Sequence, residues 1–208
     1  MAEHETDRSA IRDHVARLIS ELQRRYLPSG ARARPEAYAS AMLARLRQTP
    51  ADDVASGSSF ALLYDRLPER LISDLGAPTR AESAIHAALV LYAGHQQSRG
   101  EPMHVPGRSL GRAARDLAMS RGGAELDEAM VARFHRVATA TGPGVRLAQL
   151  RSLISLFRAH SIPLDYARLA CDLYDLDYPA SADRVRLRWG RDLHSRTTEP
   201  LPAQTPSA

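Results

Sequence analysis

Residues 79–98 of the chain, TRAESAIHAALVLYAGHQQS, decide the class of fold. Thr79 and Glu82 form the pattern T-x-x-E, in which each side chain caps a backbone N–H in the first turn of a helix. Apolar side chains then recur every three or four residues, which is the period of a helix with one buried face. This stripe consists of Ile85, Ala88, Leu89 and Tyr92. The stretch therefore predicts a helix that begins at the cap and ends near Ser98.

The same apolar period recurs on both sides of this stretch. It predicts further helices over residues 7–27, 35–46, 60–67, 109–120, 126–139, 145–160, 165–176 and 182–194. Prolines and glycine pairs separate these segments, as in connections between helices. The sequence shows no strand-like alternation. We therefore expect an all-α fold of about nine helices arranged as two small helical bundles.

A connection rich in proline and glycine divides the chain. Residues 99–107 contain two prolines and two glycines. We place a boundary here, between an N-terminal helical domain of residues 1–106 and a C-terminal helical domain of residues 107–194. Residues 195–208 contain Pro200, Pro202 and Pro206 and no periodic apolar pattern, so they are predicted to form a disordered tail.

The composition is that of an ordinary globular protein, with one exception. The 208 residues include 24 acidic and 28 basic ones, and every basic residue is arginine. Biased codon usage explains this, but each guanidinium is still a planar fork of five donors suited to phosphate. Cys171 is the only cysteine, which favours a reducing cytoplasm. The acidic start is unlike a signal peptide, and no stretch approaches the ~20 apolar residues of a transmembrane helix.

The positive charge is concentrated in one part of the chain. Residues 1–107 contain 13 arginines and 13 acidic residues, whereas residues 108–168 contain 10 arginines and 5 acidic residues. Residues 169–208 contain 5 arginines and 6 acidic residues. The C-terminal domain therefore carries the excess, and we expect its basic face there.

Helical phase places these arginines on shared sides of three consecutive predicted helices. Arginines three, four or seven residues apart lie on one side of a helix. The candidate nucleic-acid-binding residues are Arg108, Arg112, Arg115, Arg133, Arg136, Arg151 and Arg158. If the three sides face one way, they form a basic groove that can follow a phosphate backbone. The alternative is that each is an ordinary solvated helix face.

The sequence lacks the motifs of common catalytic sites. A phosphate-binding loop of the form G-x-x-x-x-G-K-[ST] cannot exist without lysine, and neither G-x-G-x-x-G after a strand nor G-x-S-x-G is present. His86 and His95 lie nine residues apart on one predicted helix, so we interpret each as a satisfied, partly buried side chain and not as a metal ligand. We predict a non-enzymatic protein with no catalytic residues, no metal or other cofactor and no small-molecule substrate.

Three features near the end of the chain are interpreted as structural. Asp172, Asp175 and Asp177 resemble a cation site, but a solvated helix end explains them. Arg184, Arg188 and Arg191 are diluted by neighbouring acids, which favours a structural or protein-facing role. Cys171 is interpreted as a small core residue.

Five segments in a fixed order resemble a known family. They are Ile85-His-Ala-Ala-Leu-Val-Leu-Tyr-Ala-Gly-His-Gln-Gln97, Ser109-Leu-Gly-Arg-Ala113, Arg133-Phe-His-Arg136, Leu147-Ala-Gln-Leu-Arg151-Ser-Leu-Ile154 and Pro163-Leu-Asp-Tyr-Ala-Arg-Leu169. No single segment is specific. The ordered set, which covers about residues 79–194, resembles CasB, the small subunit of the type I-E CRISPR surveillance complex Cascade.

This resemblance implies a function and a set of partners. CasB-like proteins are helical, non-catalytic and cytoplasmic, and two copies lie head to tail beside the backbone subunit CasC, in a complex that includes the large subunit CasA. They help to hold the target and displaced DNA strands of the R-loop near the guide RNA. No membrane is expected among the partners. The resemblance assigns this role to Arg112, Arg136 and Arg151; the other four candidates come from helical phase. Ser152 stands where some members carry a second arginine.

Two other classes of protein remain as alternatives. A helical transcriptional regulator that binds DNA as a dimer should carry its positive charge in an N-terminal helix-turn-helix, whereas residues 1–107 are neutral. A helical enzyme or ligand-binding bundle would use His86, Tyr92 and His95, and it would need a pocket with converging polar groups.

Overall fold

The computed structural model describes residues 2–29, 34–73, 76–123 and 125–195, and the structural statements below concern these residues. Its α-helices are α1 (Ala2–Tyr26), α2 (Ala37–Arg47), α3 (Phe60–Leu63), α4 (Arg80–Gln96), α5 (Leu110–Gly122), α6 (Glu128–Thr139), α7 (Pro143–Ala159), α8 (Tyr166–Leu176) and α9 (Pro179–His194). Two single-turn 3₁₀ helices, Val54–Ser56 and Glu69–Leu71, lie in connections. This described part contains nine α-helices and no strand, so the predicted all-α fold is confirmed.

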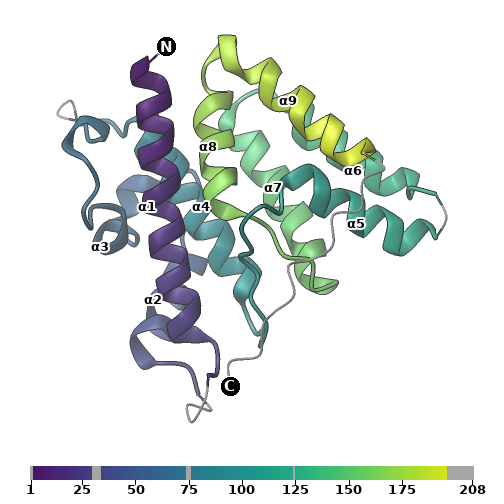
Figure 1. Cartoon of the computed structure of the whole chain (residues 1–208). Coiled ribbons are helices and arrows are strands. Elements are labelled where there is room, and N and C mark those ends of the chain that lie inside the picture. Colours follow the sequence, from purple (N-terminus) through teal and green to yellow (C-terminus); the bar gives the residue numbers. More distant parts are fainter. Residues whose placement is uncertain (1, 30–33, 74–75, 124, 196–208) are drawn as a thin grey trace.

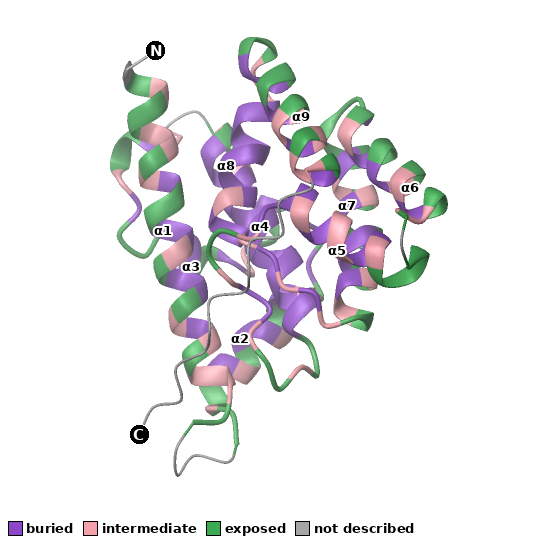
Figure 2. Cartoon of the chain, turned by 45° about the vertical axis from the view of Figure 1, so that its right-hand side comes forward, coloured by how far each residue is buried: buried purple, intermediate pink, exposed green. Residues whose placement is uncertain are grey.

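The central helix is α4, which packs against α1, α2, α7 and α8 (Figure 1). All four side chains of its predicted stripe are fully buried. Residues on its other sides are buried too, so α4 is enclosed and not merely half-buried (Figure 2). A fully enclosed helix needs apolar or small residues all round, which the run of alanines supplies.

The predicted cap of α4 is confirmed. Thr79 Oγ1 accepts a hydrogen bond from the Glu82 backbone N–H at 3.0 Å, and Glu82 Oε2 accepts one from the Thr79 N–H at 2.6 Å. Glu82 Oε1 also accepts a hydrogen bond from the Tyr64 hydroxyl at 2.9 Å. The cap therefore fixes the start of α4 and ties it to the segment after α3.

The helices before and after residue 107 pack against each other. Helix α8 contacts α1 and α4 on one side and α9 on the other. The connection at residues 99–107 also joins the loop between α7 and α8, because the Leu164 N–H donates to the Met103 carbonyl at 3.0 Å and the Val105 N–H donates to the Leu164 carbonyl at 3.3 Å. The division into two domains at residue 107 stays a prediction.

Helix α5 lies very close to α9 at Gly111. A Cβ atom at this position would come within 2.3 Å of the Trp189 carbonyl oxygen and 3.0 Å of the Leu193 nitrogen. Both are backbone atoms of α9, so only glycine allows the two helices to cross at this separation. The glycine of the Ser-Leu-Gly-Arg-Ala segment is therefore explained by packing.

Three helices, α1, α7 and α9, begin earlier than the sequence predicted. Pro143 and Pro179 were expected to separate helices, but each is the first residue of one, α7 and α9 respectively. A proline is well tolerated there, because the first helical N–H has no partner within the helix and the fixed φ suits the turn. Helix α1 also starts five residues early, at Ala2.

None of the described helices combines the length and the apolar character needed to cross a lipid bilayer. The predicted disordered tail, residues 195–208, falls outside the described residues except for Ser195.

Candidate nucleic-acid interface

Arg108, just before α5, and Arg112 and Arg115 within it all have partners. Arg108 forms an ion pair with Asp116 and is mostly buried. Arg115 Nη1 donates to the Leu193 carbonyl of α9 at 3.2 Å, and Arg112 is half-buried and engaged as well. Burial raises the pKa of Asp116, and the charge of Arg108 opposes this shift. These side chains therefore help to join α5 to its surroundings, and fewer of their donors remain for phosphate.

The two candidates on α6 differ from each other. Arg133 Nη1 donates to Ser152 Oγ of α7 at 2.8 Å, so the serine noted in the sequence supports this guanidinium. Arg136 is exposed and has no partner among the described residues. It is the candidate whose donors are most available.

The two candidates on α7 line one cavity of about 210 Å³. The cavity lies between α2, α4 and α7, and we call it the arginine groove. Its lining residues are Arg47, Val90, Leu91, Gly94, Gln97, Arg151, Ile154, Ser155 and Arg158. The lining therefore carries three guanidinium charges and no carboxylate among these described residues, which favours an anionic ligand.

Neutral oxygens hold the arginines of this groove. Arg158 Nη1 donates to Gln97 Oε1 at 2.9 Å and to the Gly94 carbonyl at 3.4 Å. Arg151 Nη2 donates to the Thr49 carbonyl at 3.4 Å. These contacts orient the guanidinium groups without cancelling their charge, and each keeps further N–H donors for a ligand.

Sequence reasoning missed Arg47. It is the last residue of α2, in the half of the chain whose charges balance, and only the packing of α2 against α4 brings it beside Arg151. The available signal was the pair of arginines in the last turn of α2, Arg45 and Arg47, without an acid in that helix. Of the seven candidates, Arg151 and Arg158 share this cavity, and the other five do not line it; Arg115 contacts α9 and Arg133 contacts α7 instead.

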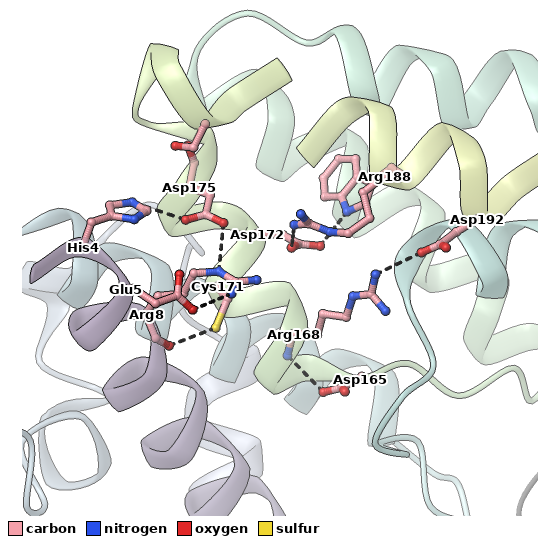
Figure 3. Close-up of polar contacts among 12 residues, drawn as sticks. His4, Glu5, Arg8, Asp165, Arg168, Cys171, Asp172, Asp175, Arg188 and Asp192 are labelled. Atoms are coloured by element: carbon pink, nitrogen blue, oxygen red, sulfur yellow. Dashed lines mark hydrogen bonds and ion pairs between the residues drawn. The ribbon is translucent and has the colours of Figure 1, made fainter. Parts of the chain in front are cut away.

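The expectation of a solvated helix end at α8 is wrong. Asp172 and Asp175 are buried and ion-paired (Figure 3). Asp172 lies 2.5 Å from Arg188 and accepts a hydrogen bond from Trp189 Nε1 at 2.6 Å, both of α9. Burial raises the pKa of Asp172, while the charge of Arg188 opposes that shift. The structural role expected for Arg188 is thereby confirmed.

The other side of α8 is tied to α1. Asp175 lies 3.0 Å from Arg8 Nε and 3.3 Å from His4 Nε2, and the Cys171 thiol donates to the Arg8 carbonyl at 3.3 Å (Figure 3). The third aspartate, Asp177, pairs with Arg146 of α7 at 3.2 Å. The three carboxylates therefore bind helices together, and no group of three potential metal ligands occurs among the described residues.

The histidines of α4 are structural, as predicted, although they are more deeply buried than expected. His86 contacts Ser59 Oγ at 2.7 Å and the Pro50 carbonyl at 3.0 Å. His95 Nδ1 lies 2.9 Å from the Tyr166 hydroxyl. Burial lowers the pKa of His95 to about 3, so the ring is neutral near pH 7.

The fold and the groove together define a class: an all-helical protein that presents fixed guanidinium groups, in which Asp172, Asp175 and the histidines of α4 are engaged in packing. The family model of the CRISPR-associated protein Cse2 matches residues 8–194. The chain therefore belongs to the Cse2 family, and it acts with other CRISPR proteins.

Solved structures agree with this assignment. CasB from Thermobifida fusca is 34% identical, with a TM-score of 0.72 over 89% of this chain and 98% of that one. A Cse2-family protein from Thermus thermophilus is 20% identical, with a TM-score of 0.58 over 89% of this chain and 96% of its own, which supports the fold. No protein of curated function matches the sequence. The family assignment favours the CRISPR hypothesis over a transcriptional regulator.

Proposed function

We propose that this protein is the non-catalytic small subunit of a type I-E Cascade complex, and that it holds the nucleic-acid backbone with arginine side chains. Its partners in this role are the backbone subunit CasC, the large subunit CasA, a second copy of itself, the guide RNA and the target DNA, in the cytoplasm. Membership of the Cse2 family supports the CRISPR role.

The observation that carries the nucleic-acid part is the arginine groove. Arg47, Arg151 and Arg158 come from two helices and line a single cavity without a carboxylate. Neutral oxygens orient two of the three, so their charge is available to an anion. Arginines held in this way attract phosphates and release counterions without reading the base sequence.

Gly94 gives this groove an open wall. It lies inside α4, yet a Cβ at this position would meet no atom within 4 Å. Glycine inside a helix costs roughly 0.5–1 kcal/mol relative to alanine. A bare backbone beside the three guanidiniums leaves room for a sugar-phosphate chain to approach closely.

The mechanism follows from the energetics of strand exchange. Replacing a DNA duplex by an RNA–DNA hybrid is nearly balanced in free energy, so modest backbone contacts tip the balance. Arg136 and Arg133 extend the positive surface on α6, with Arg136 the more exposed. Three other candidates contribute less in this proposal, because they are already engaged: Arg108 before α5, and Arg112 and Arg115 within it.

The test compares two double variants in the complex assembled with guide RNA. Arg151→Ala/Arg158→Ala removes two groove charges, and the matched control Arg24→Ala/Arg184→Ala removes two exposed charges from α1 and α9. Each lost phosphate contact flattens the slope of log affinity against log salt by about 0.7–0.9. We expect the groove variant to weaken DNA retention and to lose roughly 1.4–1.8 from that slope. Equal slopes in the groove variant and the control would overturn the proposal.

A further inference from the structure

A second groove, between α6 and α9, is apolar and open. It has a volume of about 730 Å³, and we call it the α6–α9 groove. Its lining includes Phe134, Ala138, Leu187 and Gly190. Leu187 is 58% exposed, the largest exposed fraction among the large apolar side chains of the described residues. A leucine this exposed on the wall of an apolar groove is typical of a surface that a partner covers.

Gly190 points to the same conclusion independently. It lies inside α9, where glycine costs roughly 0.5–1 kcal/mol relative to alanine. A Cβ at Gly190 would meet no atom within 4 Å, whereas one at Gly111 would collide with α9. Packing within the described chain therefore explains Gly111 and leaves Gly190 unexplained. The open space above Gly190 allows the backbone of a partner to come close.

The rim of the α6–α9 groove carries uncompensated positive charge. The one acidic residue, Asp183, already pairs with Arg186 at 2.8 Å. Arg191 is exposed and has no partner among the described residues. His135 and His194 are also exposed on the rim. A ligand that matches this rim carries carboxylates beside its apolar residues.

The groove differs from a nucleic-acid site. Its lining is mostly apolar, and its one Phe, Phe134, is only 1% exposed, so the groove presents no exposed Phe, Tyr or Trp ring on which a base could stack. A second copy of this chain does not supply the matching helix from its described residues. The other exposed large apolar residues are Tyr38, Phe60, Tyr64 and Val145, and none lies in a helix with an exposed apolar row flanked by carboxylates.

We propose that the α6–α9 groove binds an amphipathic, acidic helix of another CRISPR protein. The lining residues Asp183, Leu187, Gly190 and His194 follow one side of α9 over about 17 Å, or three turns. A helix of that length presents apolar side chains at positions i, i+3 or i+4, and i+7, with Asp or Glu on its flanks. This inference rests on the family assignment and does not require the arginine groove to bind nucleic acid.

Site-specific crosslinking tests which molecule occupies the groove. A photoreactive p-benzoylphenylalanine replaces Leu187 in the full chain, which is then assembled with the other complex subunits and guide RNA. The control carries the same group at Val145, which is equally exposed at 57% but lies on α7. We expect position 187 to crosslink to an acidic amphipathic helix of a different subunit. Crosslinks from position 187 to nucleic acid or to a second copy would overturn the proposal. A crosslinking yield at position 187 no higher than at position 145 would overturn it as well.

Binding measurements test the chemistry of the contact. The complex is assembled without this chain, and the affinity with which each variant of the chain binds to it is measured. Leu187→Glu and Arg191→Glu should weaken uptake roughly tenfold or more, because they place a carboxylate against carboxylates, while Val145→Glu should not. Uptake of Leu187→Glu equal to that of Val145→Glu would refute the proposal.

Gly190→Ala separates docking from folding. It should stabilise the isolated chain but weaken uptake, because its methyl group enters the space that the partner helix needs. An unchanged uptake would show that nothing approaches Gly190. DNA retention and its salt slope are measured in parallel, so that a failure of the arginine groove and a failure of this docking site give different results.

Discussion

The contact between α5 and α9 makes a quantitative prediction for Gly111→Ala. The added Cβ would lie 2.3 Å from the Trp189 carbonyl oxygen, 2.7 Å from Asp192 Cβ and 3.0 Å from the Leu193 nitrogen. Two of these atoms belong to backbone and cannot rotate away. Helix α9 must therefore shift outward, which loosens the packing of Trp189 and Leu193, both fully buried.

Two opposing effects set the size of the change. Overpacking of a well-packed core costs about 1–3 kcal/mol. Alanine is the better helix former by up to ~1 kcal/mol, but Gly111 is only the second residue of α5, so less of this gain is realised. We expect a net loss of about 2 kcal/mol in the free energy of unfolding. For a chain of this size that lowers Tm by roughly 4–8 °C.

Denaturant unfolding followed by tryptophan fluorescence provides the assay. Trp189 is the only tryptophan, and its indole N–H donates to Asp172, so its emission reports on the contact directly. Gly190→Ala is the matched control on α9, and it should raise the free energy of unfolding by about 0.5–1 kcal/mol. If Gly111→Ala is as stable as the natural chain and its emission is unchanged, the close crossing of α5 and α9 is refuted.

Three further outcomes follow from buried polar groups. Burial lowers the pKa of His86 and His95, so the unfolded chain binds more protons than the folded chain below pH ~6.5. The free energy of unfolding should therefore fall from pH 7.5 to pH 5.5. A free energy of unfolding that does not change over this range would contradict the burial of the two rings. Burial raises the pKa of the Cys171 thiol to about 11, so a thiol reagent such as DTNB should react with it only when urea unfolds the chain, and fast labelling of the native protein would contradict this. Arg188→Ala should lower the free energy of unfolding by about 3–5 kcal/mol, because it leaves the Asp172 charge buried without a partner. In a double-mutant cycle, adding Asp172→Asn should recover part of that loss. Strictly additive effects of the two substitutions would show that the pair does not interact.

Local patterns in the sequence predicted most of the fold. The cap of α4 and its apolar stripe are properties of adjacent residues, and both were found as expected. The starts of α7 and α9 were misplaced because proline was interpreted as a break, although it also starts helices. Whether a proline begins or ends a helix depends on the surrounding residues, which a local pattern does not take into account.

The candidate site was less accessible to sequence reasoning. Helical phase selected Arg151 and Arg158, but it could not pair them with Arg47, because that contact depends on how α2 lies across α4 and α7. The same limit explains why Asp172 and Asp175 were wrongly predicted to be exposed to solvent. Their partners come from α9 and from α1, up to 167 residues away in sequence, so their charge was assigned to solvent when it is buried.

The charges of α8 have a consequence for exchanging segments between relatives. Arg168 pairs with Asp192 and Asp172 pairs with Arg188, so two oppositely directed ion pairs connect α8 to α9. A chimera that takes only α9 from a homologue with different residues at positions 188 and 192 leaves both Arg168 and Asp172 of α8 without their partners. The two helices must therefore be exchanged together, and the incoming pair must also match Arg8, which pairs with Asp175 of α8, and Gly111, which lets α5 pack against α9.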